Sequence, residues 1–138
     1  MENLLKFYIN GEWVAPLSDA TMPVLNPATE KQIGTVALGN EADVDRAVAA
    51  ASTAFEEFSQ TSKDGRLALL RKVRAITEAR MEELAQAMRM EMGAPITMSR
   101  DVQADAAVGH LDGFITALEE LEERLKLANG DIMVREPI

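Results

Sequence analysis

Residues 6–14 read Lys6-Phe-Tyr-Ile-Asn-Gly-Glu-Trp-Val14 and carry the sharpest local signal in the chain. Asn10 and Gly11 are residue types that tolerate positive φ at the centre of a tight turn. Aromatic and β-branched residues, which favour strands, lie on both sides of them. This stretch therefore predicts a two-stranded β-hairpin.

Further short strands are predicted after this hairpin. Residues 22–27 form an extended stretch that turns at Asn26-Pro27, because proline presets φ and asparagine can hydrogen-bond its own backbone. Residues 33–38 predict another strand. Residues 1–39 are thus expected to consist of strands and turns.

After Asn40 the apolar residues follow helical spacing. Asn40 is a suitable N-cap, and Glu41 and Asp43 lie in the first turn, near the positive end of the helix dipole. The apolar positions recur at i, i+3, i+4, i+7, i+11 and i+14, at Val44, Ala47, Val48, Ala51, Phe55 and Phe58. This pattern predicts an amphipathic helix.

A second helical segment is predicted after a Thr61-Ser62 cap. Its buried stripe is formed by Leu67, Leu70, Val73 and Ile76. The stripe loses register at residues 77–80, which favours two helices or one kinked helix. It then resumes at Met81, Leu84, Met88 and Met92. Gly93 suits the helix C-cap, and Pro95 cannot continue the hydrogen-bond ladder.

A third helical region is predicted from Ile96 to Lys126, closed by Asn129-Gly130. Its apolar face comprises Val102, Leu111, Phe114, Ile115, Leu118, Leu121 and Leu125. Residues 40–130 are therefore expected to be helical, and residues 131–138 are expected to begin a strand. An amphipathic helix buries its apolar stripe against a sheet or another helix. The predicted strands are too few and too short to provide a sheet that covers all of these helices.

Composition narrows the functional classes. The chain has 138 residues, of which 47% are hydrophobic and 27% charged, as in a soluble globular domain. A net charge of −9 disfavours nucleic acid and anionic lipid as partners. The absence of cysteine excludes disulfides and thiolate zinc sites. No stretch has the length of a membrane span or the form of a signal peptide, so we expect a cytoplasmic protein.

Six stretches together resemble the N-terminal region of the aldehyde dehydrogenase superfamily. They occur in family order across almost the whole chain, although each alone is weak. The stretches are Tyr8-Ile-Asn-Gly-Glu-Trp-Val14; Asn26-Pro-Ala-Thr-Glu30 with Ile33-Gly34; Asp43-Val-Asp-Arg-Ala-Val-Ala-Ala-Ala51 with Ala54-Phe55; Arg66 with Leu70-Arg71-Lys72; Glu91-Met-Gly-Ala-Pro95; and Arg135-Glu-Pro-Ile138. Gly65 and Phe58 depart from the pattern, where the family tends to have Glu and Trp, at positions that touch no chemistry.

The resemblance implies an α/β fragment. Its strands and three to four helices would form the outer layer of a Rossmann-type, NAD(P)-binding domain covering residues 1–138 and beyond. It also implies an NAD(P)-dependent oxidation of an aldehyde to a carboxylic acid through a cysteine thioester. The family's nucleophilic cysteine, general-base glutamate, oxyanion-hole asparagine and cofactor-binding glycines would all lie downstream. Accordingly, we expect no catalytic, cofactor-binding or metal-binding residue in this chain.

Other candidate sites have simpler explanations. His110 is the single histidine and stands at the edge of a helical face without an evident orienting partner, since Asp112 points elsewhere on a helix. The acidic run at residues 119–123 is expected to be the solvated side of that helix. Gly34 and Gly39 do not form a dinucleotide fingerprint, which needs three glycines at fixed spacing.

The methionines near residues 81–98 could mark a recognition surface, because methionine adapts to many partners. The helical spacing of Met81, Met88 and Met92 instead favours core positions. Without a downstream sheet, however, these side chains would be partly uncovered, and exposed apolar patches promote association.

Two functions are compatible with these observations. The first is a truncated aldehyde dehydrogenase that is inactive as an isolated chain and binds no NAD or NADP. The alternative is a non-catalytic helical module for oligomerisation or interaction, in which the apolar stripes cover one another. A homo-oligomer is expected, because uncovered stripes favour self-association.

Overall fold

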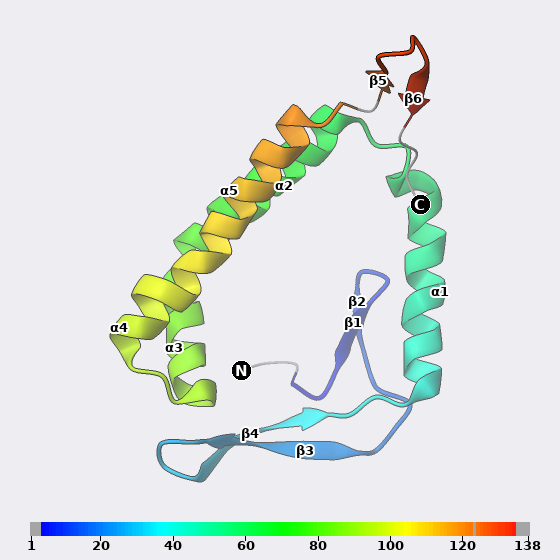
Figure 1. Cartoon of the computed structure of the whole chain (residues 1–138). Helices are drawn as coiled ribbons and strands as arrows, with labels where there is room; N and C mark the ends of the chain where they lie inside the picture. Colours follow the sequence, from blue (N-terminus) through cyan, green and yellow to red (C-terminus); the bar gives the residue numbers. More distant parts are fainter. Residues whose placement is uncertain (1–3, 123, 135–138) are drawn as a thin grey trace.

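A computed structural model describes residues 4–122 and 124–134 (Figure 1). It contains short strands, four longer helices, a single-turn helix and a π-helical segment. The elements are β1 (Phe7–Ile9), β2 (Glu12–Val14), β3 (Thr21–Asn26), β4 (Lys31–Ala37), α1 (Glu41–Phe58), α2 (Lys63–Ala79), α3 (Met81–Met92), α4 (Ile96–Met98), η1 (Ser99–Ala104), α5 (Asp105–Glu120), β5 (Arg124–Lys126) and β6 (Ile132–Val134). None of the helices in these described ranges is both long enough and apolar enough to cross a membrane.

The predicted first hairpin is confirmed. Asn10 has φ 53° and Gly11 has φ 81°, so both residues of the two-residue loop adopt the left-handed conformation that a type I′ turn requires. Antiparallel pairing places Tyr8 opposite Trp13, and their ring centroids lie 5.3 Å apart. The cross-strand aromatic pair stabilises the register that the turn sets.

The strands make three separate antiparallel pairs, β1–β2, β3–β4 and β5–β6, among the described residues. The predicted turn between β3 and β4 is confirmed, because the Asn26 side chain accepts a hydrogen bond from the Ala28 amide at 2.9 Å. A two-stranded ribbon is marginal by itself, so each pair depends on what packs against it.

The helix boundaries follow local capping. The Asn40 side chain accepts from the Asp43 amide at 3.1 Å, while the Asp43 carboxylate accepts from the Asn40 amide at 3.2 Å, which forms a capping box at the start of α1. Ser62 caps α2 by accepting from the Gly65 amide at 3.1 Å. The predicted break between α2 and α3 is confirmed at Arg80, which ends one helix and precedes the next.

Gly93 ends α3 in the left-handed conformation, with φ 71°, as predicted. A Cβ atom at this position would lie 2.8 Å from Cγ of Pro27, in the β3–β4 turn. Glycine is therefore needed here both for the backbone conformation and for the approach of α3 to that turn.

The third helical region differs from the prediction, which extended to Lys126. The chain forms one turn of α4, then η1 with its wider π turns, and then α5, which ends at Glu120. Residues 124–126 form strand β5, so Leu125 belongs to a hairpin and not to the helical face. Asn129-Gly130 is the hairpin turn and not a helix cap, with Gly130 at φ 92°.

Tertiary contacts explain this early helix end. Nζ of Lys63, at the start of α2, donates to the carbonyl oxygens of Glu119 and Leu121 at 2.7 and 3.0 Å. These bonds satisfy carbonyl groups that a continuing helix would otherwise use. Of the expected strand over residues 131–138, Ile132–Val134 is observed as β6, and residues 135–138 lie outside the described residues.

The core lies where α2, α3, η1 and α5 meet. Its buried apolar side chains within the described ranges are Leu67, Ala85, Ala104, Val108 and Ile115. Several side chains expected on buried faces are exposed instead: Val73 and Ile76 of α2 by 42% and 49%, Val102 of η1 by 59%, and Phe114 of α5 by 66%. Val102 lies within η1, whose π turns place one more residue between hydrogen-bonded partners than an α-helix does, so α-helical spacing does not hold from Val102 into α5. Phe114 lies within α5 itself, on the flank of the stripe that buries Val108 and Ile115.

Candidate functional site

The candidate site is an uncovered apolar surface, and its clearest part lies on α1. Figure 1 shows α1 on the far side of the β1–β2 hairpin from the α2–α5 pair. The helix contacts β1, and a shallow groove between hairpin and helix is lined on the helix side by Ala47, Ala50, Ala51 and Ala54. The neighbouring stripe, which we term the α1 apolar face, comprises Val44, Val48, Phe55 and Phe58, exposed by 59%, 57%, 44% and 50%.

A buried carboxylate fixes the position of α1. Asp43 is only 4% exposed, and its two oxygens accept from the Leu17 amide at 3.0 and 3.2 Å. Arg46 lies 3.5 Å from the same carboxylate and also donates to the Ala15 carbonyl at 3.1 Å. The segment that follows the first hairpin is thereby tied to the first turn of α1.

Sequence reasoning assigned Asp43 only a favourable place near the helix dipole, and it missed this long-range role. The spacing of Asn40 and Asp43 is that of a capping box, which was the available signal for the local part. The bonds to Leu17 span 26 residues and could not be read from any local pattern.

The α2–α5 pair is joined by surface ion pairs. Arg74 binds Asp112 through two nitrogens at 2.8 and 3.3 Å, and Arg71 lies 2.5 Å from Glu119. Glu119, Glu120 and Glu122 of the acidic run are all exposed, as expected, and Glu123 lies outside the described residues. Glu119 also pairs with Arg71 across the helices. Hydrogen bonding to Arg74 lowers the pKa of Asp112. Asp112 and Glu119 therefore form ion pairs that join α5 to α2.

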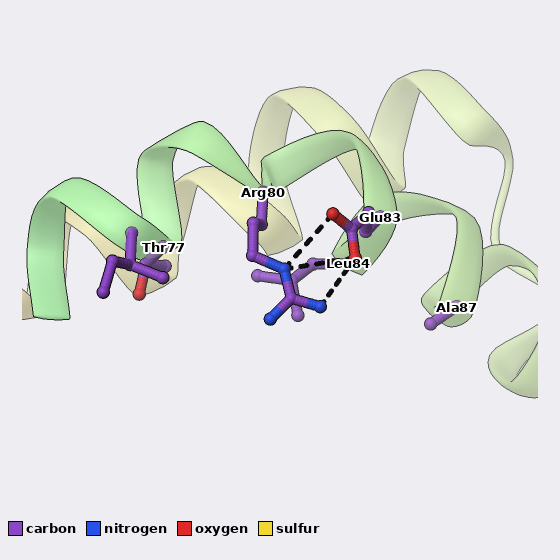
Figure 2. Close-up of a pocket in the computed structure, with 6 residues that line it drawn as sticks. Thr77, Arg80, Glu83, Leu84 and Ala87 are labelled. Atoms are coloured by element: carbon purple, nitrogen blue, oxygen red, sulfur yellow. Dashed lines mark hydrogen bonds and ion pairs between the residues drawn. The ribbon is translucent and has the colours of Figure 1, made fainter. Parts of the chain in front are cut away.

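A groove lies at the break between α2 and α3 (Figure 2). It has a volume of about 380 Å³ and is lined by Ile76, Thr77, Arg80, Glu83, Leu84 and Ala87. Figure 2 shows Arg80 and Glu83 turned toward each other at the groove, with Nη2 of Arg80 2.7 Å from Oε2 of Glu83. Hydrogen bonding to Arg80 lowers the pKa of Glu83, so this carboxylate stays ionised and paired and is a poor general base.

The other positions singled out from the sequence do not converge on a centre. His110 is exposed on α5, and its neighbour Asp112 is engaged by Arg74. Residues 4–122 and 124–134 contain no group of three or more His, Asp or Glu side chains that could hold a metal ion. A Cβ on Gly39 would lie 3.2 Å from the Phe7 ring, so this glycine allows β1 to approach the start of α1.

The methionines of α3 are partly uncovered, as expected for the case without a downstream sheet, and they are not all core residues. Met81 and Met88 are half-buried, but Met92 is 60% exposed. Helical spacing placed all three on one stripe, and only the part of that stripe that faces η1 is covered, because α3 packs mainly against η1. Met92 adds to the uncovered apolar surface.

The total surface shows how much is uncovered. The chain exposes 10302 Å², whereas a compact monomer of 15.1 kDa exposes about 7,100 Å². The difference is about 3,200 Å², several times the ~800 Å² that each partner buries in a standard protein interface. The described elements therefore leave far more surface uncovered than a compact monomer of this mass does.

Comparison with known proteins gives matches in both sequence and structure. The model of the aldehyde dehydrogenase family matches residues 13–138. A Staphylococcus aureus protein (strain bovine RF122 / ET3-1) assigned as an aldehyde dehydrogenase is 44% identical over 140 residues, which is all of this chain and 29% of that relative.

Solved structures agree with this match. The crystal structure of an aldehyde dehydrogenase from Bartonella henselae has a TM-score of 0.88 and 36% identity, covering 91% of this chain and 26% of that one. A mutant aldehyde dehydrogenase C from Pseudomonas syringae, in complex with NAD⁺ and octanal, has a TM-score of 0.87 and 42% identity, covering 89% and 25%. This chain therefore belongs to the aldehyde dehydrogenase family and spans 25–29% of the length of these relatives.

Proposed function

We propose that the chain forms the N-terminal part of the NAD(P)-binding domain of an aldehyde dehydrogenase and acts there as a structural layer. The observation that carries this proposal is the excess of about 3,200 Å² of exposed surface over a compact monomer of this mass. An apolar helix face is stabilised when other polypeptide covers it. This chain corresponds to 26% of the Bartonella henselae structure, and the rest of such a polypeptide could cover these faces.

In this proposal the whole enzyme oxidises an aldehyde to a carboxylic acid with NAD or NADP. The reaction proceeds through a cysteine thioester, which water then hydrolyses. These 138 residues contain no cysteine, so the nucleophile must be supplied by other polypeptide. The isolated chain is therefore inactive in this reaction.

The described residues do not fit the dinucleotide either. A pyrophosphate binds at a helix N-terminus whose amide groups are free and whose surroundings are not acidic. Each of the four longer helices instead carries carboxylates in its first turn, at Glu41 and Asp43, Asp64, Glu82 and Glu83, and Asp105. At α1 the Asn40 side chain already accepts from the Asp43 amide, and the Asp43 carboxylate accepts from the Asn40 amide. We expect no measurable NAD(P) binding by this chain.

The test is a chimera. This chain replaces the 140 matching residues of the Staphylococcus aureus relative, and NADH or NADPH formation is followed with a panel of aldehydes. We expect the chimera to be active, with the intact relative as the positive control and the relative lacking those residues as the negative control. A folded but inactive chimera contradicts the proposal. An NAD-dependent rise in the melting temperature of the isolated chain contradicts the expected absence of cofactor binding.

The alternative of a self-standing helical module requires the apolar stripes to cover one another. The exposure of the α1 apolar face speaks against that arrangement within one copy of the chain. A homo-oligomer is proposed only for the assembled enzyme.

A further inference from the structure

We infer that the charge of Lys63 selects between two conformations at the end of α5, a hairpin and a longer helix. In the structure its ammonium group binds the end of α5, and residues 124–126 pair with β6. When that charge is removed, α5 extends to Lys126 and the hairpin is lost. This conformational switch goes beyond the proposed function and does not rest on it.

The sequence at the end of α5 favours a helix that continues beyond Glu120. Residues 117–126 are all alanine, leucine, glutamate, arginine or lysine, which are among the strongest helix formers. Glu122 and Lys126 have the i, i+4 spacing, with the acid first, that stabilises a helix. Glu120 has the same relation to Arg124. Local sequence therefore does not explain why β5 is a strand.

The β5–β6 hairpin has little support from the rest of the described structure. It consists of three residue pairs, with Leu125 opposite Met133 at the centre. The two strands pack mainly against each other, and all three residues of β6 are at least 40% exposed. A two-stranded ribbon of this kind is only marginally stable. A single interaction at the end of α5 can therefore decide between hairpin and helix.

The interaction found at that place comes from Lys63. Its Nζ donates to the carbonyl oxygens of Glu119 and Leu121 at 2.7 and 3.0 Å. In a continuing α-helix these oxygens would accept from the amides four residues further along. Leu121 instead has an extended backbone, with ψ 119°. The ammonium group thus replaces the amide donors of a continuing helix, and its positive charge is favoured at the negative end of the α5 dipole.

The position of Lys63 in its own helix does not account for this residue. Lys63 is the first residue of α2, where the positive end of that helix's dipole disfavours a cation. Its side chain is half-buried and contacts carbonyls 56 and 58 residues away along the chain. The favourable electrostatic contacts of Lys63 therefore lie on α5, as the inference requires.

The test compares three variants of the chain by NMR. Lys63→Met keeps an unbranched side chain without the charge, whereas Lys63→Arg keeps the charge and the donors. Lys72→Met removes a charge from an exposed position on the same helix and is the matched control. We expect Lys63→Met to change the Cα secondary shifts of residues 124–126 from strand-like to helical. It should also remove the nuclear Overhauser contact between Leu125 and Met133, which the other two variants should keep.

A proline substitution distinguishes extension of α5 from simple loss of structure. Glu122→Pro introduces a residue that cannot continue a helix and that restricts the preceding residue to extended conformations. Leu121 is already extended, so the substitution fits the observed structure. Added to Lys63→Met, it should abolish the helical shifts of residues 124–126 and restore the cross-strand contact.

Each result decides the inference. Helical shifts in Lys63→Met that Glu122→Pro reverses support it. Strand-like shifts in Lys63→Met overturn it, and so does a loss of order that Glu122→Pro does not reverse, because Lys63 then only stabilises the hairpin. Helical shifts in Lys63→Arg or Lys72→Met would show that the ammonium charge at this position is not the selector. Absence of the cross-strand contact from the unsubstituted chain also overturns the inference, because the hairpin is then not the selected conformation.

Discussion

The α2–α5 pair and α1 have the same kind of amphipathic sequence, but their apolar faces differ in how far they are buried. Leu67 of α2 and Val108 and Ile115 of α5 are buried between their helices, and Lys63, Arg71 and Arg74 bind groups on the partner helix. The four valines and phenylalanines of α1 are equally apolar and equally well spaced, yet all of them are exposed, whereas on α2 only part of the stripe, at Val73 and Ile76, is exposed. An apolar stripe thus shows that a helix is made to bury a face, but not that the covering partner lies in the same chain.

The largest expected effect is loss of a side chain between α2 and α5. Leu67→Ala should lower the free energy of unfolding by about 2–4 kcal/mol, because a buried leucine leaves a cavity when it is truncated. Urea unfolding followed by circular dichroism measures the change. Leu69→Ala on the same helix is the control, since Leu69 is 47% exposed and should cost far less. Equal losses in the two variants would show that the α2–α5 core is not formed.

Removal of the buried carboxylate at the start of α1 should come next. Asp43→Ala leaves the Leu17 amide without its acceptor and breaks the capping box, at a cost of about 1–3 kcal/mol. Hydrogen exchange at the Leu17 amide should accelerate in the same variant. Asp45→Ala, at an exposed position on the same helix, is the control and should change neither measurement. Unaltered exchange at Leu17 would mean that α1 is oriented by other contacts.

Two glycine substitutions should change the free energy of unfolding in opposite directions. Gly93→Ala should destabilise the chain by about 1–2 kcal/mol, because φ is 71° there and the new Cβ would meet Pro27. Gly113→Ala should stabilise it by about 0.5–1 kcal/mol, because Gly113 lies inside α5 with open space around it. Thermal unfolding of both variants tests the comparison. A gain from Gly93→Ala would show that α3 does not approach the β3–β4 turn.

The ion pair between α3 and η1 makes a prediction about pH. Hydrogen bonds from Arg100 and Gln86 lower the pKa of Glu82 from 4.5 to about 2. Because the folded value is the lower one, this stabilisation is complete above pH 4.5 and is lost as the pH falls through about 2. Arg100→Gln should raise the pKa of Glu82 toward 4.5 in an NMR titration. Glu83, which pairs with Arg80, should titrate as before.

The smallest effect is expected on the α1 apolar face. Phe55→Ala should change the stability of the isolated chain by less than about 0.5 kcal/mol, because the side chain is already 44% exposed and little cavity can form. The same urea experiment used for Leu67→Ala provides the measurement. A loss as large as that of Leu67→Ala would mean that the α1 apolar face is covered in the isolated chain, and the contrast between the two regions would disappear.

Sequence reasoning succeeded where the structure depends on a few neighbouring residues. It located the Asn10-Gly11 turn, the Asn40 and Ser62 caps, the break near Arg80 and the end of α3 at Gly93. It also expected the family membership, which the comparisons show. Each of these features is decided by backbone conformation or hydrogen bonding within a few residues.

Sequence reasoning was wrong where one local pattern is compatible with two structures. Asn10-Gly11 and Asn129-Gly130 are identical pairs, and the second was interpreted as a helix cap. In the structure it is the turn of the β5–β6 hairpin, because the chain leaves the helix at Leu121. At that point the Leu121 carbonyl accepts a hydrogen bond from Lys63, which lies 58 residues away along the chain, so no local pattern indicates it.

The sequence by itself determined which segments become turns, caps and amphipathic helices, since steric limits on φ and local hydrogen bonds act over a few residues. The tertiary structure alone decided where α5 ends, that Asp43 is buried against the Leu17 amide, and which apolar stripes are covered. These depend on contacts between residues distant in the chain, which exist only once the elements are placed together. The contacts are hydrogen bonds in the first two cases and removal of apolar surface from water in the third.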